Sequence, residues 1–224
     1  TAYEIYQCDW SSDVCSSDLL AITYSNLAQH DKALPLEIRA LAIWEKVQGP
    51  EHPDTATSLN NLASTYSDLG QHDKALPLEI RGLAIRERGL GPEHPDTAIS
   101  LGNLAHTYSW LAQYDKALPL NLRALAIREK VLGAEHPDTA LSLSNLASTY
   151  SDLAQPDKAL PLDLRALAIR EKVLGPEHPT TAYSYIGIAR YFSRIKKIDS
   201  AILFYKLAVN NFQKSRETNS RLEG

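Results

Sequence analysis

Apolar residues recur along this chain at the spacing of α-helices. One segment begins near Pro53 and ends near Gly70, and its apolar positions are spaced i, i+3, i+4 and i+7, which places them on one helix face. These positions are Leu59, Leu62, Ala63 and Tyr66. A second segment, from Asp73 to Leu90, has similar spacing. Its apolar positions are Leu76, Ile80, Leu83 and Ala84. The pattern predicts two consecutive helices, here named helix A and helix B.

Residues that begin and end helices flank both segments. Asp73 is placed to cap the N-terminus of helix B, and Gly91 is placed to take the left-handed conformation just after its C-terminus. Pro77 falls just inside the first turn of helix B, where at most one backbone hydrogen bond is lost. Pro53 is predicted at the first position of helix A, where proline is well tolerated. Consecutive helices are therefore expected to be joined by short turns.

The helix pair repeats along the chain with a constant step of 42 residues. The sequence EHPD or EHPT marks each turn, with histidine at His52, His94, His136 and His178. Equivalent tyrosines are Tyr24, Tyr66, Tyr108 and Tyr150. Neither helix of a pair can bury its apolar face alone, so neighbouring pairs must stack. The sequence predicts an all-α array of antiparallel helix pairs.

The unit resembles the long tetratricopeptide repeat of kinesin light chain type. The signature positions of that repeat are matched by Leu59, Leu62, Ala63, Tyr66 and Ala75. The resemblance covers Leu20 to about Lys214 and implies a right-handed superhelical solenoid that binds proteins or peptides. The unit departs from the family where helix B usually has an aromatic residue, so looser packing of the helix pair is expected there. The replacements are Glu37, Glu79, Asn121 and Asp163, and the last unit has Tyr205.

Residues 1–19 do not follow the repeat and contain both cysteines. The stretch DWSSDVCSSDL resembles the conceptual translation of a short-read sequencing adapter, and the preceding TAYEI resembles its outer arm. We expect residues 1–19 to be artefactual and disordered, and residues 20–215 to form the array, with a truncated first unit, three full units and an atypical last unit. Residues 216–224 are then a C-terminal tail. The first segment holds four of the 27 acidic residues and none of the 23 basic ones, so the rest of the chain is neutral.

Composition narrows the classes of partner. A formal charge of -4 does not fit a protein that attracts a nucleic acid backbone. No apolar run approaches the roughly 18 residues that a membrane-spanning helix needs, and the first residues lack the pattern of a secretory leader. We expect a cytoplasmic protein that binds a protein or a peptide, and neither nucleic acid nor membrane.

The four turn histidines are the candidates for metal binding or acid–base chemistry. Equivalent residues of stacked helices lie about 10 Å apart per layer, which is too far for nitrogens that must each approach a metal to about 2 Å. A structural role for these histidines is therefore expected. The sequence also shows no nucleophile elbow, no phosphate-binding loop and no paired carboxylates. We expect no enzyme activity, no catalytic residue, no metal and no cofactor.

A polar stripe lies beside the apolar face of each helix A. In three successive units it consists of Asn60, Asn61, Ser64, Ser67 and Asp68, then Gly102, Asn103, His106, Ser109 and Trp110, then Ser144, Asn145, Ser148, Ser151 and Asp152. In the tetratricopeptide family this stripe lines the groove that receives peptides, so the resemblance predicts a peptide-binding groove. Asparagine amides can pair with an extended backbone, and Trp110 can serve as an apolar anchor. A solvated helix face is the alternative.

The end of the chain bears on the kind of partner. Basic residues enter the stripe only near its end, at Arg190 and Arg194, so a partner's C-terminal carboxylate is not favoured. The segment AILFYKLAVNNFQKSRE resembles the one that precedes a caspase-like CHAT protease domain in some bacterial relatives. The leading hypothesis is a scaffold that holds a peptide or partner helix in its groove. The alternative is the regulatory or sensing arm of a larger enzyme of that protease type.

Overall fold

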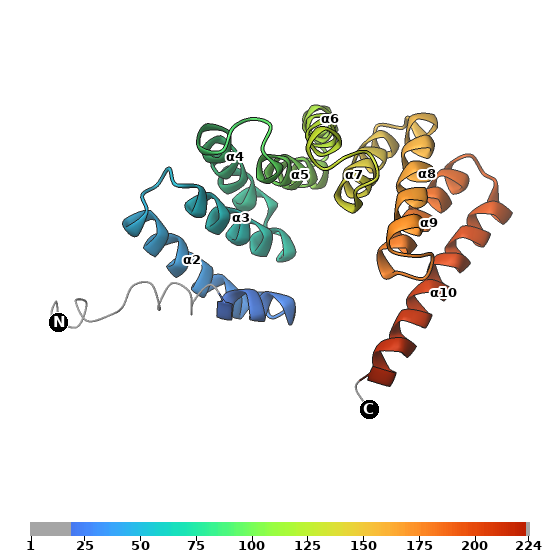
Figure 1. Cartoon of the computed structure of the whole chain (residues 1–224), viewed down its shortest axis with the longest axis horizontal. Coiled ribbons are helices and arrows are strands. Elements are labelled where there is room, and N and C mark those ends of the chain that lie inside the picture. Colours follow the sequence, from blue (N-terminus) through green and yellow to red (C-terminus); the bar gives the residue numbers. More distant parts are fainter. Residues whose placement is uncertain (1–18, 223–224) are drawn as a thin grey trace. The chain divides into compact units, whose positions relative to one another are not determined.

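The computed structural model describes residues 19–222, and these residues are helical apart from the connecting turns (Figure 1). Residues 19–26 are helical and precede the nine longer helices of this region. These are α2 (His30–Val47), α3 (Pro53–Asp68), α4 (His72–Gly89), α5 (Pro95–Trp110), α6 (Tyr114–Val131), α7 (Pro137–Asp152), α8 (Pro156–Val173), α9 (Pro179–Arg194) and α10 (Ile198–Leu222). Residues 19–222 contain no β-strand. The described chain divides between Ala112 and Gln113 into unit 1 and unit 2.

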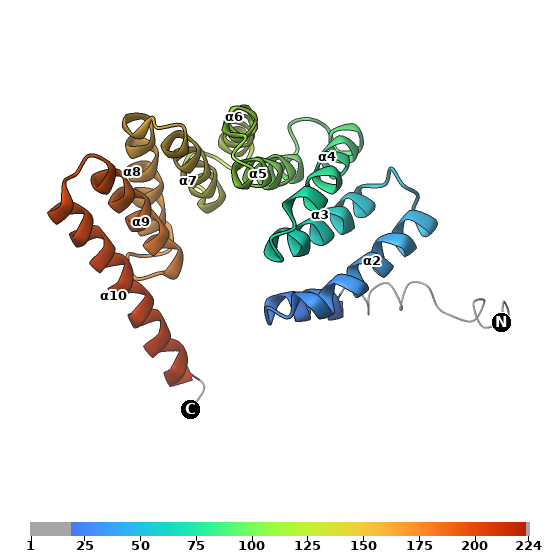
Figure 2. The same ribbon diagram turned by 180° about the vertical axis from the view of Figure 1, so that it is seen from behind.

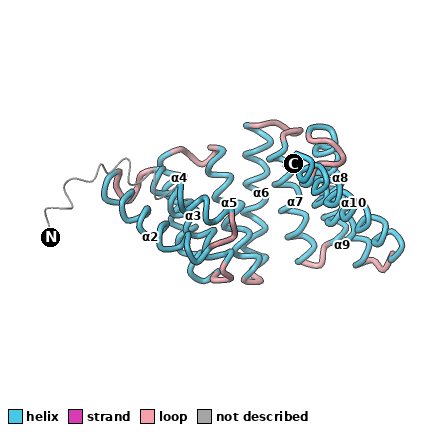
Figure 3. The backbone as a smooth tube through the Cα atoms, turned by 90° about the horizontal axis from the view of Figure 1, so that it is seen from below, coloured by secondary structure: helices cyan, strands magenta, loops and turns pink. Residues whose placement is uncertain are grey.

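Consecutive helices pack as antiparallel pairs within each unit. In unit 1, α3 packs on α4 and is flanked by α2 and α5, and in unit 2, α7 packs on α8 and α9 packs on α10 (Figures 1 and 2). Short loops join these helices (Figure 3). Helices α3, α5, α7 and α9 are the predicted helices A, and α2, α4, α6, α8 and α10 are the predicted helices B. The predicted all-α fold of stacked helix pairs is confirmed.

Each helix A begins at the proline that recurs with the 42-residue step, as the sequence predicts, but the cap is a histidine. Pro53 is the first residue of α3, and the Nδ1 atom of His52 accepts a hydrogen bond from the Asp54 backbone N–H at 3.2 Å. The histidine therefore satisfies one of the backbone donors that a helix N-terminus leaves open. The same arrangement recurs in the later turns. The capping residues there are His94, His136 and His178.

The ends of helix B correct two details of the sequence analysis. Helix α4 begins at His72 with Gln71 as its N-cap, so Asp73 lies in the first turn and is not the cap. Pro77 is the sixth residue of α4 and thus lies in the second turn, where it leaves the Asp73 carbonyl without its helical hydrogen bond. Gly91 has φ +100° and donates its N–H to the Arg86 carbonyl at 3.2 Å, which confirms the predicted left-handed C-terminus.

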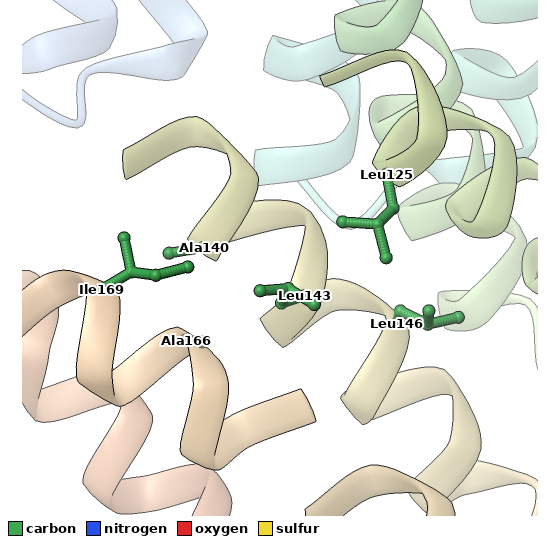
Figure 4. Packing of buried hydrophobic residues seen from close by; sticks show 6 residues of the cluster. All are labelled: Leu125, Ala140, Leu143, Leu146, Ala166 and Ile169. Atoms are coloured by element: carbon green, nitrogen blue, oxygen red, sulfur yellow. The ribbon is translucent and has the colours of Figure 1, made fainter. Parts of the chain in front are cut away.

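Small side chains build thin cores between neighbouring helices. Figure 4 shows a core cluster of unit 2, in which residues of α7 pack against residues of α6 and of α8. Its members are Leu125, Ala140, Leu143, Leu146, Ala166 and Ile169. Ala140 and Ala166 are completely buried, and their small size lets α7 and α8 approach closely. A fully buried leucine such as Leu143 contributes about 1.5–3 kcal/mol to stability.

Helices α4 and α6 each carry a buried arginine that bonds to the following helix A of the same unit. In unit 1, Arg86 of α4 donates to the Asp96 carbonyl at 3.0 Å and to Ser100 Oγ at 2.9 Å, both on α5. Burial lowers the pKa of Arg86, and the nearby Asp96 opposes this shift. In unit 2, Arg128 makes the equivalent bonds to the Asp138 carbonyl and to Ser142. These bonds fix the register of neighbouring helices because a buried guanidinium must find its acceptors.

The described residues cover part of the predicted domain boundaries. Except for Leu19, the segment that the sequence marks as artefactual lies outside the described residues. At the other end, α10 continues to Leu222 and so extends into the segment expected to be a tail.

Candidate functional site

In unit 1, two neighbouring helices A each present one row of accessible side chains. The rows are spaced i, i+4, i+7 and i+11, which is one helix face. On α3 they are Thr57, Asn61, Ser64 and Asp68, and on α5 they are Ile99, Asn103, His106 and Trp110. The two helices are held side by side by a bond from the Asn60 amide to Ser100 Oγ at 3.0 Å. The rows together form the surface that we call the helix A stripe of unit 1.

Several residues of the predicted stripe are placed elsewhere. Asn60 is buried, and its amide joins α3 to α5, so it does not lie on the accessible face of α3. Gly102 and Ser151 are also buried. Ser109 is half-buried and donates its hydroxyl to the Ala105 carbonyl of its own helix at 3.0 Å. Adjacent positions on a helix point about 100° apart, and the packing against the next repeat decides which of them is covered.

Trp110 is the large exposed residue of the unit 1 stripe, with 63% of its surface accessible. The His72 ring stacks on the indole with centroids 5.1 Å apart and planes 11° apart. The indole Nε1–H donates to His106 Nε2 at 3.0 Å. This bond requires a neutral His106, and burial together with the neighbouring His72 lowers the pKa of His106, while Asp68 raises it. The two imidazoles therefore hold the indole in one orientation on the surface.

Unit 2 presents the equivalent stripe with a different chemistry. On α7 it consists of Leu141, Asn145, Ser148 and Asp152, and on α9 of Tyr183, Gly187, Arg190 and Arg194. Asp152 Oδ1 lies 3.4 Å from Arg190 Nη2 and 3.7 Å from Arg194 Nη2. Arg190 Nη1 also donates to Ser148 Oγ at 3.5 Å. The structure therefore brings together the two arginines and the Asp152 and Ser148 positions that the sequence singled out.

Sequence reasoning missed the apolar end of both stripes. Ile99, Leu141 and Tyr183 occupy equivalent positions, four residues before the asparagine or glycine of each stripe, and are 43%, 45% and 60% exposed. The sequence could have revealed these three residues, because they recur with the 42-residue step. They add an apolar contact surface at the N-terminal end of α5, α7 and α9.

The polar replacements of the family's aromatic residue are buried and hydrogen-bonded. Thr107 Oγ1 donates to Glu79 Oε1 at 3.0 Å, and the Asn121 amide donates to Thr149 Oγ1 at 2.9 Å. Burial raises the pKa of Glu79 to about 7, with the Thr107 bond acting against this shift. A hydrogen bond to the next helix A thus replaces aromatic packing at these positions.

Asp163 is the equivalent residue of α8, and arginines surround it. Burial raises its pKa to about 7, while Arg190 and Arg170 act in the opposite direction.

Among residues 19–222, no group of three or more His, Cys, Asp or Glu side chains is arranged to hold a metal ion. Within the same range, no helix has both the length and the apolar character needed to cross a membrane.

Known proteins share this architecture. The family model for the tetratricopeptide repeat matches residues 13–88, 96–172 and 155–214. A point variant of the nearly identical TPR-like repeats of a kinesin light chain candidate from Podosopora anserina is 29% identical, with a TM-score of 0.77 over 94% of this chain and 100% of that chain. Another structure of such repeats from that organism is 30% identical, with a TM-score of 0.73 over 90% of this chain and 96% of that chain.

More distant structures share the fold. BtubC (BKLC) from P. vanneervenii is 20% identical, with a TM-score of 0.74 over 96% of this chain and 93% of that chain. A search of the curated proteins finds no match.

Proposed function

Because the chain belongs to the tetratricopeptide repeat family, a family of protein-interaction modules, we propose that it is a scaffold that binds an extended peptide or a partner helix on its helix A stripes. The observation that carries the proposal is the repeated row of accessible side chains on adjacent helices A within each unit. The rows on α5, α7 and α9 each have polar residues in the middle and a large apolar or aromatic residue at one or both ends. The row on α3 has polar residues only. This mixture is typical of peptide-binding surfaces.

The middle of the stripe suits a peptide backbone. Asn61 and Asn103 lie at equivalent positions on the adjacent helices α3 and α5, and both are partly accessible. An asparagine amide can donate to a carbonyl and accept from an N–H of the same extended segment. Two such amides on neighbouring helices can therefore hold successive parts of one peptide without reading its side chains.

Trp110 supplies the anchor. An exposed tryptophan that is already held by His72 and His106 loses little side-chain entropy when a partner covers it. Pre-organised aromatic residues of this kind are enriched among the residues that dominate binding energy. The described residues offer no specific support for the alternative of an arm that regulates a protease.

The test uses peptides selected from a random library on the whole chain. Asn103→Ala and Trp110→Ala should each weaken the binding of a selected peptide by about 1 to 2 kcal/mol, or roughly five- to thirty-fold, with unchanged helicity by circular dichroism. Ile80→Ala is the control, because Ile80 is 46% exposed on α4, a helix B, and so lies outside the helix A stripe. Equal losses in the Ile80 variant and the stripe variants would place the binding surface elsewhere.

A further inference from the structure

A small pocket opens on the stripe of unit 2, between α7, α8 and α9. Its volume is about 150 Å³, and its lining includes Ser144, Ser148 and Ser151 of α7, Asp163 of α8, and Gly187 and Arg190 of α9. Tyr183 and Ile186 of α9 complete the lining. A pocket of this volume can hold one small chemical group.

The pocket presents hydrogen-bond donors. Arg170 Nη1 donates to Ser144 Oγ at 2.9 Å and Arg190 Nη1 donates to Ser148 Oγ at 3.5 Å. Each serine oxygen thus accepts a hydrogen bond, and a hydroxyl that accepts can still donate its proton to a ligand. The bonds of Arg190 to Ser148 and Asp152 are long, at 3.5 and 3.4 Å. The guanidinium of Arg190 can therefore turn to a stronger acceptor at little cost.

The charges around the pocket do not balance. The cationic groups that face it or border it are Arg170 from α8 and Arg190 and Arg194 from α9, and the acidic groups are Asp152 from α7 and Asp163 from α8. Asp163 and Arg190 line the pocket, and the other three groups lie next to them, so three guanidinium groups and two carboxylates lie in or beside it. Because Asp163 is buried and its pKa is raised to about 7, a substantial fraction of it is protonated at neutral pH, which increases the positive excess.

Two departures from the repeat, Arg190 and Gly187, meet the buried Asp163 at this one place. The position of Arg190 is occupied by Ser64, His106 and Ser148 in the preceding helices A, and that of Gly187 is occupied by an asparagine. A Cβ atom at residue 187 would lie 2.6 Å from Asp163 Oδ1, so the glycine makes room for the buried carboxyl group. The arginine and the glycine therefore form one arrangement with Asp163 and are not two separate changes.

We propose that this pocket is a subsite for a single oxyanion, a carboxylate or phosphate group, carried by a side chain of the bound partner. The Arg190 guanidinium and the hydroxyls of Ser144 and Ser148 donate to the oxyanion, and Asp163 takes up a proton when it binds. Only the source of the oxyanion rests on the proposed function, since the pocket itself can be tested with free ions. Binding of a carboxylate, whose own charge is constant over this range, is then stronger at pH 6 than at pH 8, because proton uptake by Asp163 accompanies it.

The first experiment titrates the whole ¹⁵N-labelled chain with sodium acetate and with inorganic phosphate, with chloride at matched ionic strength as the reference. We expect saturable shifts of the amides around Ser148 and Gly187 with either oxyanion and none with chloride. Arg190→Ser, which restores the residue of the preceding repeats, should weaken acetate binding at least tenfold. Arg81→Ser removes the same charge from unit 1 and should leave it unchanged. Asp163→Asn should abolish the difference in acetate affinity between pH 6 and pH 8.

The outcomes separate this proposal from the proposed function. Absence of saturable shifts around Gly187, or equal affinity in the Arg190→Ser and Arg81→Ser variants, would overturn the oxyanion subsite while leaving peptide binding untouched. Peptides selected on the chain identify the source: replacing their acidic residues by Asn or Gln should weaken binding to the native chain tenfold and to Arg190→Ser much less. A phosphorylated side chain is the source if only phosphopeptides show this coupling. If neither the unmodified peptides nor the phosphopeptides show an effect that depends on Arg190, the assignment of the oxyanion to a partner's side chain is wrong.

Discussion

The Glu79 carboxyl of α4 and the Thr107 hydroxyl of α5 are joined by a 3.0 Å hydrogen bond in the buried interface between two repeats. Glu79 is only 4% exposed. The equivalent pair in unit 2 is Asn121 with Thr149. An ionisable and a neutral residue thus occupy the same structural position in two copies of one unit, which gives a direct way to measure the cost of the charge.

Stability should decrease as the pH rises, because folding raises the pKa of Glu79 from 4.5 to about 7. The folded state then holds a proton that the unfolded state releases, so the stabilisation is complete below pH 4.5 and is lost as the pH rises through 7. The full loss is about 3 kcal/mol at about 1.4 kcal/mol per unit. Glu79→Gln, which mimics Asn121, should reduce this slope in urea unfolding between pH 4.5 and 8. Identical slopes for the two proteins would contradict the account.

Ala154→Gly should stabilise the chain. Ala154 lies just after the C-cap of α7 and has φ +56°, and the equivalent residue after α3 is Gly70 with φ +71°. A left-handed conformation costs a residue with a Cβ atom about 1 kcal/mol or more, which glycine avoids. We expect a gain of about 0.5–1 kcal/mol after the entropy cost of glycine is included. The reverse change, Gly70→Ala, is the matched control and should destabilise; a loss in both variants would show that φ is not the cause.

Arg128→Ala should destabilise unit 2 by about 2–4 kcal/mol, because it removes donors from buried acceptors on α7. Amide hydrogen exchange should accelerate in α6 and α7. Arg88→Ala is the comparison, since Arg88 is 63% exposed in its ion pair with Glu51. That change should alter stability by no more than about 0.5 kcal/mol. Equal effects would mean that burial does not set the importance of these arginines.

The orientation of Trp110 should depend on the protonation of His106. The pKa of His106 lies below its ordinary value of 6.5, so the bond from the indole N–H should persist at pH 6.5 and be lost at lower pH. The indole N–H resonance of Trp110 reports this change directly. His106→Ala should remove the titration, and a midpoint above pH 6.5 in the native chain would contradict the lowered pKa.

The regular features of the fold could be predicted because they are periodic. The spacing of Leu59, Leu62 and Tyr66 defines a helix face, and the 42-residue step defines the stack. The histidine caps could not be found in this way, because the bond from Asp54 to His52 depends on the backbone angles of the turn. The burial of Arg86 was equally out of reach, because its acceptors become neighbours only when repeats stack.

The candidate site was predictable to a lesser extent. Asn61, Ser64 and Asp68 were placed on the accessible face, whereas Asn60 is covered by the next repeat. Whether Asn60 or its neighbour Asn61 is accessible depends on the position of the neighbouring helix, and the sequence of a single helix does not give that position. The pocket at Arg190 combines residues from three helices, and only the structure brings Asp163 against Gly187.

The central claim is that partners bind on the helix A stripes, and a spin-labelled peptide tests it most directly. A selected peptide that carries a nitroxide is added to the ¹⁵N-labelled chain, and the loss of amide intensity is mapped onto the helices. We predict broadening centred on Asn61, Asn103 and Trp110 in unit 1, or on Asn145 and Arg190 in unit 2. Broadening centred on exposed positions of helix B, such as Ile80 or Leu164, with the stripes unaffected, would contradict the claim.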